Sequence, residues 1–184
     1  MHSLVEVVDQ AGLGLDEALV ISLVEAVLEA ENIGGTVVVA FVDEPTIAAL
    51  NEQYRALSES TDVLSFRYAD AEANPGAFWP EESGAASGEE AAMAASGPPS
   101  AGPTLDLGEV IVCPAVVRRY ARSDGVDPGQ QLAWTLVHGT LHLVGYDHER
   151  DEGEMREREK ALLKGFDPLV RAISFPANTE RRQT

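Results

Sequence analysis

The chain has 184 residues, 45% of them hydrophobic, which is enough for one folded domain with a substantial core. Its apolar runs are far shorter than the roughly 20 residues of a membrane-spanning helix, and residues 1–9 lack the features of a signal peptide. The net charge of −18 argues against loose binding to bulk nucleic acid, so any nucleic-acid surface should be small and local. The single cysteine, Cys113, excludes an internal disulfide and fits a reducing cytoplasm.

The periodicity of apolar residues predicts strands and helices that alternate along the first part of the chain. Strands are expected at 4–8, 36–42 and 62–66, and helices at 15–32 and 46–57. Asp16 is a suitable N-cap for the first helix, and Gly34-Gly35 would stop it. The β-branched run 36–42 is typical of a strand that is covered on both faces.

Residues 68–104 differ in composition from the rest of the chain. They are rich in Ala, Gly, Ser, Glu and Pro, and they contain six acidic residues and no basic one. This composition predicts a disordered insertion, with a lid or a partner-binding segment as the alternative. A fourth strand is expected at 107–113, helices at 114–123, 127–145 and 151–164, and a frayed tail at 176–184.

These elements predict an α+β fold, with one domain over residues 1–175 that contains the insertion 68–104. We expect a small mixed four-stranded sheet packed with about five helices. The helix at 127–145 would be central, and the chain's main group of histidines lies at its end.

Three of the four histidines lie within the eleven residues 138–148. His138 and His142 are four residues apart, so they share one face of a helix. Gly145 can end that helix in a left-handed conformation and let the chain bring His148 to the same point. Three converging imidazoles form a zinc site with an open fourth position, although imidazole also suits nickel, copper and iron.

A zinc ion in such a site makes hydrolysis the expected reaction. It lowers the pKa of a bound water toward neutrality and polarises a carbonyl or phosphoryl oxygen. The spacing H-x-x-x-H-x-x-G-x-x-H is also that of the metzincin proteases, which carry a glutamate base directly after the first histidine. Because Gly139 occupies that position here, a zinc peptidase is a disfavoured alternative.

The sequence H-G-T-L-H-L-V-G-Y-D-H at 138–148 resembles the characteristic motif of the YbeY family of bacterial metal-dependent endoribonucleases. Other similar segments are L-N-E-Q-Y-R at 50–55, T-D-V-L-S-F at 61–66, L-G-E-V-I-V at 107–112, and Met155 with Glu159. The similarity runs from about Val37 to Gly165. The chain departs from the family at Ala56-Leu57-Ser58, where Gly-Lys-Asp is usual, at Glu109, where Asp is usual, and in its longer insertion.

The resemblance implies a single-strand-specific endoribonuclease that acts in rRNA processing, including small-subunit rRNA 3′-end maturation, and in ribosome quality control. It implies one zinc ion per chain, or another divalent transition metal, held by His138, His142 and His148. His138 and Arg55 would be catalytic, and Arg55 and Ser65 would bind substrate. The arginine suits phosphate because its guanidinium is planar and permanently charged.

The expected partners are ribosomal RNA and ribosomal subunits, with ribosomal proteins or GTPases as further candidates, in the cytoplasm. We expect no binding to membranes or DNA. A ribosome-assembly factor with a mainly structural metal site is the alternative function. The sequence leaves open whether water or an RNA hydroxyl is the nucleophile, and it offers no obvious general base near the histidines.

Some residues near these motifs have two open interpretations. Asp147 could orient an imidazole or cap the following turn. Thr61, Asp62 and Ser65 could line a cleft or serve the strand. A solvated face is favoured over an RNA-contact patch for the basic group Arg118, Arg119 and Arg122. His2 is remote in sequence and is not expected to be a ligand.

Overall fold

The computed structural model describes residues 3–68, 105–148 and 150–176. The predicted disordered insertion and frayed tail fall almost wholly outside these residues, as does His2, so the predictions about them stay predictions. Within the described ranges, none of the helices combines the length and the apolar character needed to cross a bilayer.

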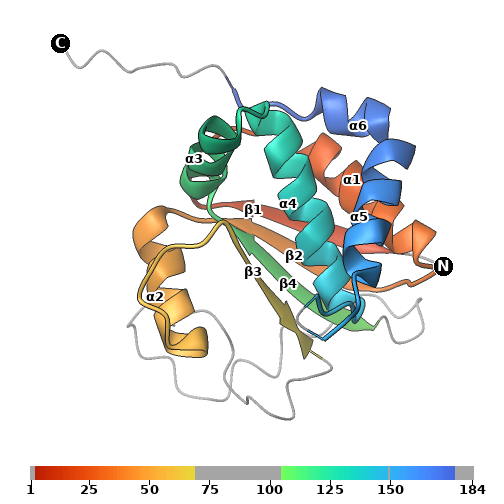
Figure 1. Ribbon diagram of the computed structural model, residues 1–184, viewed down its shortest axis with the longest axis horizontal. Coiled ribbons are helices and arrows are strands. Elements are labelled where there is room, and N and C mark those ends of the chain that lie inside the picture. Colours follow the sequence, from red (N-terminus) through yellow and green to blue (C-terminus); the bar gives the residue numbers. More distant parts are fainter. Residues whose placement is uncertain (1–2, 69–104, 149, 177–184) are drawn as a thin grey trace, which may run out of the picture.

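The sheet has the strand order β1-β2-β4-β3 (Figure 1). The strands are β1 (Leu4–Asp9), β2 (Thr36–Phe41), β3 (Val63–Arg67) and β4 (Asp106–Val112). β2 runs parallel to β1 and β4, whereas β3 pairs antiparallel with β4. The predicted α+β fold with a mixed four-stranded sheet is therefore confirmed, and β3 lies at one edge of the sheet.

The described part of the chain contains six helices. They are α1 (Glu17–Ala30), α2 (Glu44–Arg55), α3 (Pro114–Asp124), α4 (Pro128–Leu143), α5 (Glu154–Gly165) and α6 (Asp167–Ala172). Aspartates start three of them: the side chains of Asp16, Asp43 and Asp127 accept hydrogen bonds from N–H groups in the first turns of α1, α2 and α4.

The five predicted helices are all present with ends within three residues of the prediction, and two differences have a local explanation. α1 ends before the expected Gly34-Gly35 stop, because Asn32 adopts a φ of 55° and turns the chain two residues earlier. The short helix α6 was not predicted, although Asp167 and Pro168 in its first turn are residues that commonly start a helix.

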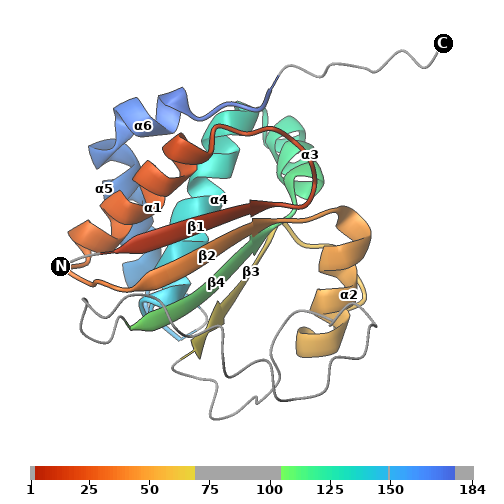
Figure 2. The same ribbon diagram turned by 180° about the vertical axis from the view of Figure 1, so that it is seen from behind.

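Helix α4 lies across one face of the sheet and contacts α1, α3, α5 and α6 (Figures 1 and 2). The main hydrophobic core fills this layer, and α2 packs on the other face in a second cluster. Adjacent residues of β4 point to opposite faces, so Val110 belongs to the first cluster and Ile111 to the second. Burial on both faces explains the continuous β-branched run of β2.

Gly139 lets α4 approach the sheet closely. A Cβ at this position would lie 2.6 Å from Cγ1 of Val110 and 3.1 Å from Oγ of Ser65. The Ser65 hydroxyl donates a hydrogen bond to the Gly139 carbonyl at 3.0 Å. This contact holds α4 beside the edge strand β3, and the glutamate of a metzincin protease would not fit here without moving the helix.

Candidate metal centre and substrate cleft

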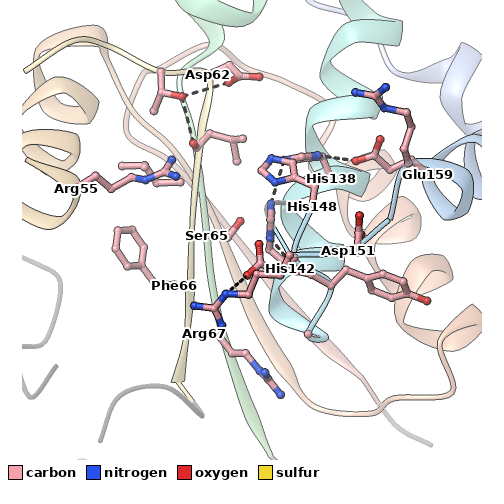
Figure 3. Close-up of a pocket in the computed structure, with 18 of the residues that line it drawn as sticks. Arg55, Asp62, Ser65, Phe66, Arg67, His138, His142, His148, Asp151 and Glu159 are labelled. Carbon is pink, nitrogen blue, oxygen red and sulfur yellow. Dashed lines mark hydrogen bonds and ion pairs between the residues drawn. The ribbon is translucent and has the colours of Figure 1, made fainter. Parts of the chain in front are cut away.

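A cleft of about 1330 Å³ opens along the edge strand β3, with α2 on one side and α4 and α5 on the other (Figure 3). Figure 3 shows Arg55 on one side of β3 and the histidines on the other. The cleft brings together the candidate residues from three separate segments, namely Arg55, Thr61, Asp62, Ser65, His138, His142 and His148.

The three histidines converge as their spacing predicts. Their ring centroids lie 4.7, 5.1 and 5.2 Å apart, and their candidate ligand atoms all lie within 4.8 Å of one another. The Nε2 atoms of His138 and His142 are 3.1 Å apart, close to the roughly 3.3 Å between ligand nitrogens in a tetrahedral site with Zn–N bonds of about 2.0–2.1 Å. Gly145 makes the turn that returns His148, with a φ of 105°.

The other ring nitrogens of the two α4 histidines are held by hydrogen bonds. Nδ1 of His138 donates to Oε1 of Glu159 at 2.5 Å, and Nδ1 of His142 donates to the Tyr146 carbonyl at 3.0 Å. The second oxygen of Glu159 accepts a hydrogen bond from Nε1 of Trp134 at 3.3 Å. These bonds fix the tautomer in which Nε2 carries a free lone pair. The residues therefore fit a metal ion.

The protonation state of His142 also favours metal binding. Its pKa is lowered, first by burial and then by the nearby His138 ring. A lowered pKa keeps this imidazole neutral at neutral pH, which is the form that binds a metal.

Arginines and carboxylates line the cleft together, so its positive charge is local to a few side chains. Arginines from β3, α2, α5 and the loop after α4 line it: Arg55, Arg67, Arg150 and Arg156. The arginines of α3 do not line this cleft. Arg119 pairs with Glu44 at 2.9 Å, and the Arg118 guanidinium lies 4.2 Å from the ring centre of Phe175. The position of the α3 arginines away from the cleft, and these contacts of Arg118 and Arg119 with protein side chains, argue against an RNA-contact patch on α3.

Three residues near the motifs serve the structure. Oδ2 of Asp62 accepts a hydrogen bond from the Thr135 hydroxyl at 3.3 Å, although Asp62 also lines the cleft. Asp147 forms an ion pair with Arg150 at 3.2 Å, and its carbonyl accepts the N–H groups of residues 150 and 151. Ser65 is partly committed to the Gly139 carbonyl.

Sequence reasoning did not find the partners of the imidazoles. In the sequence, Glu159 belongs with Met155 to a family-like motif, and nothing there links Trp134 to the histidines. Glu159 lies 21 positions after His138, so no spacing within one helix could link the two. The cleft arginines Arg67 and Arg156 were also missed, although Arg67 directly follows the Ser65-Phe66 motif on β3.

The three-histidine cluster in an open cleft fits the metal centre of a metal-dependent hydrolase. Residues 10–167 match the family model described as Endoribonuclease YbeY. A protein of that name from a Roseiflexus species is 33% identical over 88% of this chain and 91% of its own length. Another, from Pelotomaculum thermopropionicum, is 35% identical over 84% of this chain and 90% of its own length. The chain belongs to the YbeY endoribonuclease family.

A solved structure has a similar fold. The solution structure of a Thermotoga maritima protein aligns with a TM-score of 0.54 at 23% identity, covering 97% of this chain and 100% of that one. This likeness supports the arrangement of strands and helices described above.

Proposed function

We propose that this chain is a single-strand-specific endoribonuclease that acts in rRNA processing, including small-subunit rRNA 3′-end maturation, and in ribosome quality control. The observation that carries this proposal is the single cleft that unites the histidine cluster with Arg55. Its proposed partners are ribosomal RNA and ribosomal subunits, with ribosomal proteins and GTPases as further candidates. A ribosomal substrate would place the protein in the cytoplasm.

We propose zinc as the metal, held by His138, His142 and His148 through their inward-facing ring nitrogens. When bound, such an ion supplies Lewis acidity toward a phosphoryl oxygen and lowers the pKa of water. Glu159 and the Tyr146 carbonyl keep two of the rings in the ligating orientation. These two imidazoles are thus already oriented to bind a metal.

Arg55, in the last turn of α2, is proposed to bind and stabilise the reacting phosphate. Its guanidinium keeps its charge throughout the reaction and can bind two phosphate oxygens at once. The Ser65 hydroxyl donates a hydrogen bond to the Gly139 carbonyl oxygen, and its own oxygen can still accept a hydrogen bond from a ribose hydroxyl. This is the substrate-binding role that we propose for Ser65.

Cleavage assays test the reaction class directly. Metal-loaded protein is incubated with single-stranded RNA, double-stranded RNA and casein, each with and without a chelator. We expect chelator-sensitive cleavage of the single-stranded RNA alone. Chelator-sensitive cleavage of casein with intact RNA would contradict the proposal and favour a peptidase.

A second experiment separates the enzyme from an assembly factor with a structural metal. His138→Ala is compared with wild type for rRNA processing in cells and for binding to ribosomal subunits. A nuclease loses processing with this change. Intact processing together with intact ribosome binding would refute the nuclease.

A further inference from the structure

We propose that Arg67 and Arg156 form a phosphate clamp that holds RNA on both sides of the histidine cluster. This inference rests on the proposed ribonuclease function and adds two substrate-binding residues to Arg55. Both arginines line the cleft, and both are exposed.

The first support for the clamp is that these two arginines are available. Four other arginines form ion pairs, namely Arg119, Arg150, Arg158 and Arg171. Arg67 and Arg156 form neither an ion pair nor a hydrogen bond within the described ranges 3–68, 105–148 and 150–176. As far as the described residues go, their guanidinium groups are therefore available to bind an anion.

The acidic side chains of the cleft, by contrast, are engaged by the protein. Glu159 accepts hydrogen bonds from His138 and Trp134, and Asp147 pairs with Arg150. The two oxygens of Asp151 accept backbone N–H groups at 2.8 and 2.9 Å where α5 begins. Asp62 accepts the Thr135 hydroxyl. Each carboxylate thus accepts hydrogen bonds from a protein donor, and none of them pairs with Arg67 or Arg156 in the described part of the chain.

The position of Arg67 follows from a series of contacts between β3 and α4. Asp62 accepts a hydrogen bond from the Thr135 hydroxyl. Three residues later, the Ser65 hydroxyl donates a hydrogen bond to the Gly139 carbonyl. Further along, Nη1 of Arg67 lies 3.5 Å from the position that a Cβ of Gly145 would occupy. Arg67 therefore lies beyond His142, at the end of the cluster where the chain turns.

Arg156 lies at the other end of the cluster. It precedes Glu159 by three residues on α5, so the two side chains share a face of that helix, and both line the cleft. Because Glu159 is bonded to His138, Arg156 lies on the His138 side. The histidine cluster thus sits between the two guanidinium groups.

A single-stranded polyanion matches this arrangement, because its phosphates recur along the chain on both sides of the one being cleaved. Every neutralised phosphate releases counterions, and the slope of log K against log salt is about −0.7 per contact for single strands. Losing one arginine contact should therefore reduce the steepness of this slope by about 0.7.

The test measures binding of a fluorescent 2′-O-methyl single-stranded RNA by anisotropy over a range of salt concentrations. The variants are Arg67→Gln, Arg156→Gln and the double variant, with Arg67→Lys and Arg156→Lys to keep the charge. Arg122→Gln is the matched control, since Arg122 is exposed in the last turn of α3 and does not line the cleft. It changes the net charge by the same amount.

We expect slopes that are less steep by about 0.7 in each Gln variant and by about 1.4 in the double variant, with wild-type slopes for the Lys variants and Arg122→Gln. With cleavable RNA, KM should rise more than kcat falls. Wild-type slopes in both Gln variants, or an equal loss in Arg122→Gln, would overturn the clamp. If wild type cleaves RNA but the variants bind normally, the clamp alone fails. If wild type neither binds nor cleaves RNA, the proposed function fails first.

Discussion

At the scale of single residues, the site depends on side chains outside the histidine motif. Glu159 is 6% exposed and bonded to both His138 and Trp134, so it fixes one ligand from a different helix. Arg55 is placed by the end of α2, where Ala56 adopts a left-handed φ of 56°. Two predictions follow from these contacts.

Glu159→Gln keeps the shape of the side chain but removes its charge. The charged carboxylate accepts the Nδ1 hydrogen of His138 and so holds the ring's orientation and tautomer, and loss of such partners weakens metal binding by about 10- to 100-fold. We expect a fall of about 10-fold or more in zinc affinity, measured by competition with a chromogenic chelator. Glu157→Gln is the control, because Glu157 is exposed on the same helix. Equal zinc affinities in the two variants would contradict the role of Glu159.

Ala56→Gly should stabilise the protein. A left-handed conformation costs a non-glycine residue about 1–2 kcal/mol, and part of this gain is offset by the flexibility of glycine in the unfolded chain. We expect a net gain of about 0.5–1 kcal/mol in the free energy of unfolding, measured in urea. Ala49→Gly, on the exposed face of α2, should instead lose about 1 kcal/mol. A loss of stability in both variants would show that Ala56 is not strained.

At the scale of the elements, α4 and its neighbours position the ligands. Glu31, just after α1, accepts hydrogen bonds from the Tyr146 hydroxyl at 3.1 Å and from Nε of Arg158 on α5 at 2.6 Å. The carbonyl of the same Tyr146 accepts the hydrogen bond from His142. The turn that carries the last ligand is thus connected to two other helices. On its opposite side, α4 is held against β3 by Ser65 and Gly139.

Gly139→Ala should push α4 away from the sheet. The new methyl group would lie 2.6 Å from Cγ1 of Val110, and overpacking of this kind typically costs about 1–3 kcal/mol. We expect a loss of that size in urea unfolding, together with weaker zinc binding. Gly165→Ala is the control, because a Cβ there meets nothing within 4 Å. If both variants are equally stable, the close approach of α4 is not required.

At the scale of the whole molecule, a net charge of −18 coexists with a cleft lined by four arginines. We expect charge on the rest of the surface to repel bulk RNA, while these arginines supply local positive charge among the four carboxylates that also line the cleft. A metal held by the three histidines would also join parts of the chain that come together only in the folded state. His142 lies in the last turn of α4, whereas His148 lies in the loop that follows it. Metal binding and folding should therefore be coupled.

Zinc should stabilise the folded protein through this coupling. At a free concentration about 100 times its Kd, a ligand that binds only the folded state adds about 2.7 kcal/mol to the free energy of unfolding. We expect a gain near this value in urea unfolding, lost when a chelator is added. His148→Ala should show little of the gain. If zinc does not change the free energy of unfolding of the wild-type protein, the proposed metal site is contradicted.

Much of this could be predicted from the sequence, because the signals are local. Residue spacing on one helix, with Gly145 after it, predicts that His138, His142 and His148 converge. Apolar periodicity predicts the four strands. What could not be predicted depends on contacts between distant segments. The packing of α5 on α4 determines the hydrogen bond from His138 to Glu159 and the position of Arg156. The early end of α1 depends on a backbone turn at Asn32 that periodicity does not encode.

The most direct test of the account is cleavage of an end-labelled single-stranded RNA under single-turnover conditions. Wild type, metal-stripped wild type, stripped wild type with zinc restored, and His148→Ala are compared. His148 is exposed, so alanine should remove a ligand without damaging the core. We predict that stripping abolishes cleavage, that zinc restores it in wild type, and that zinc does not restore it in His148→Ala. Undiminished cleavage by the stripped protein or by His148→Ala would contradict the claim that the three histidines form the RNA-cleaving centre.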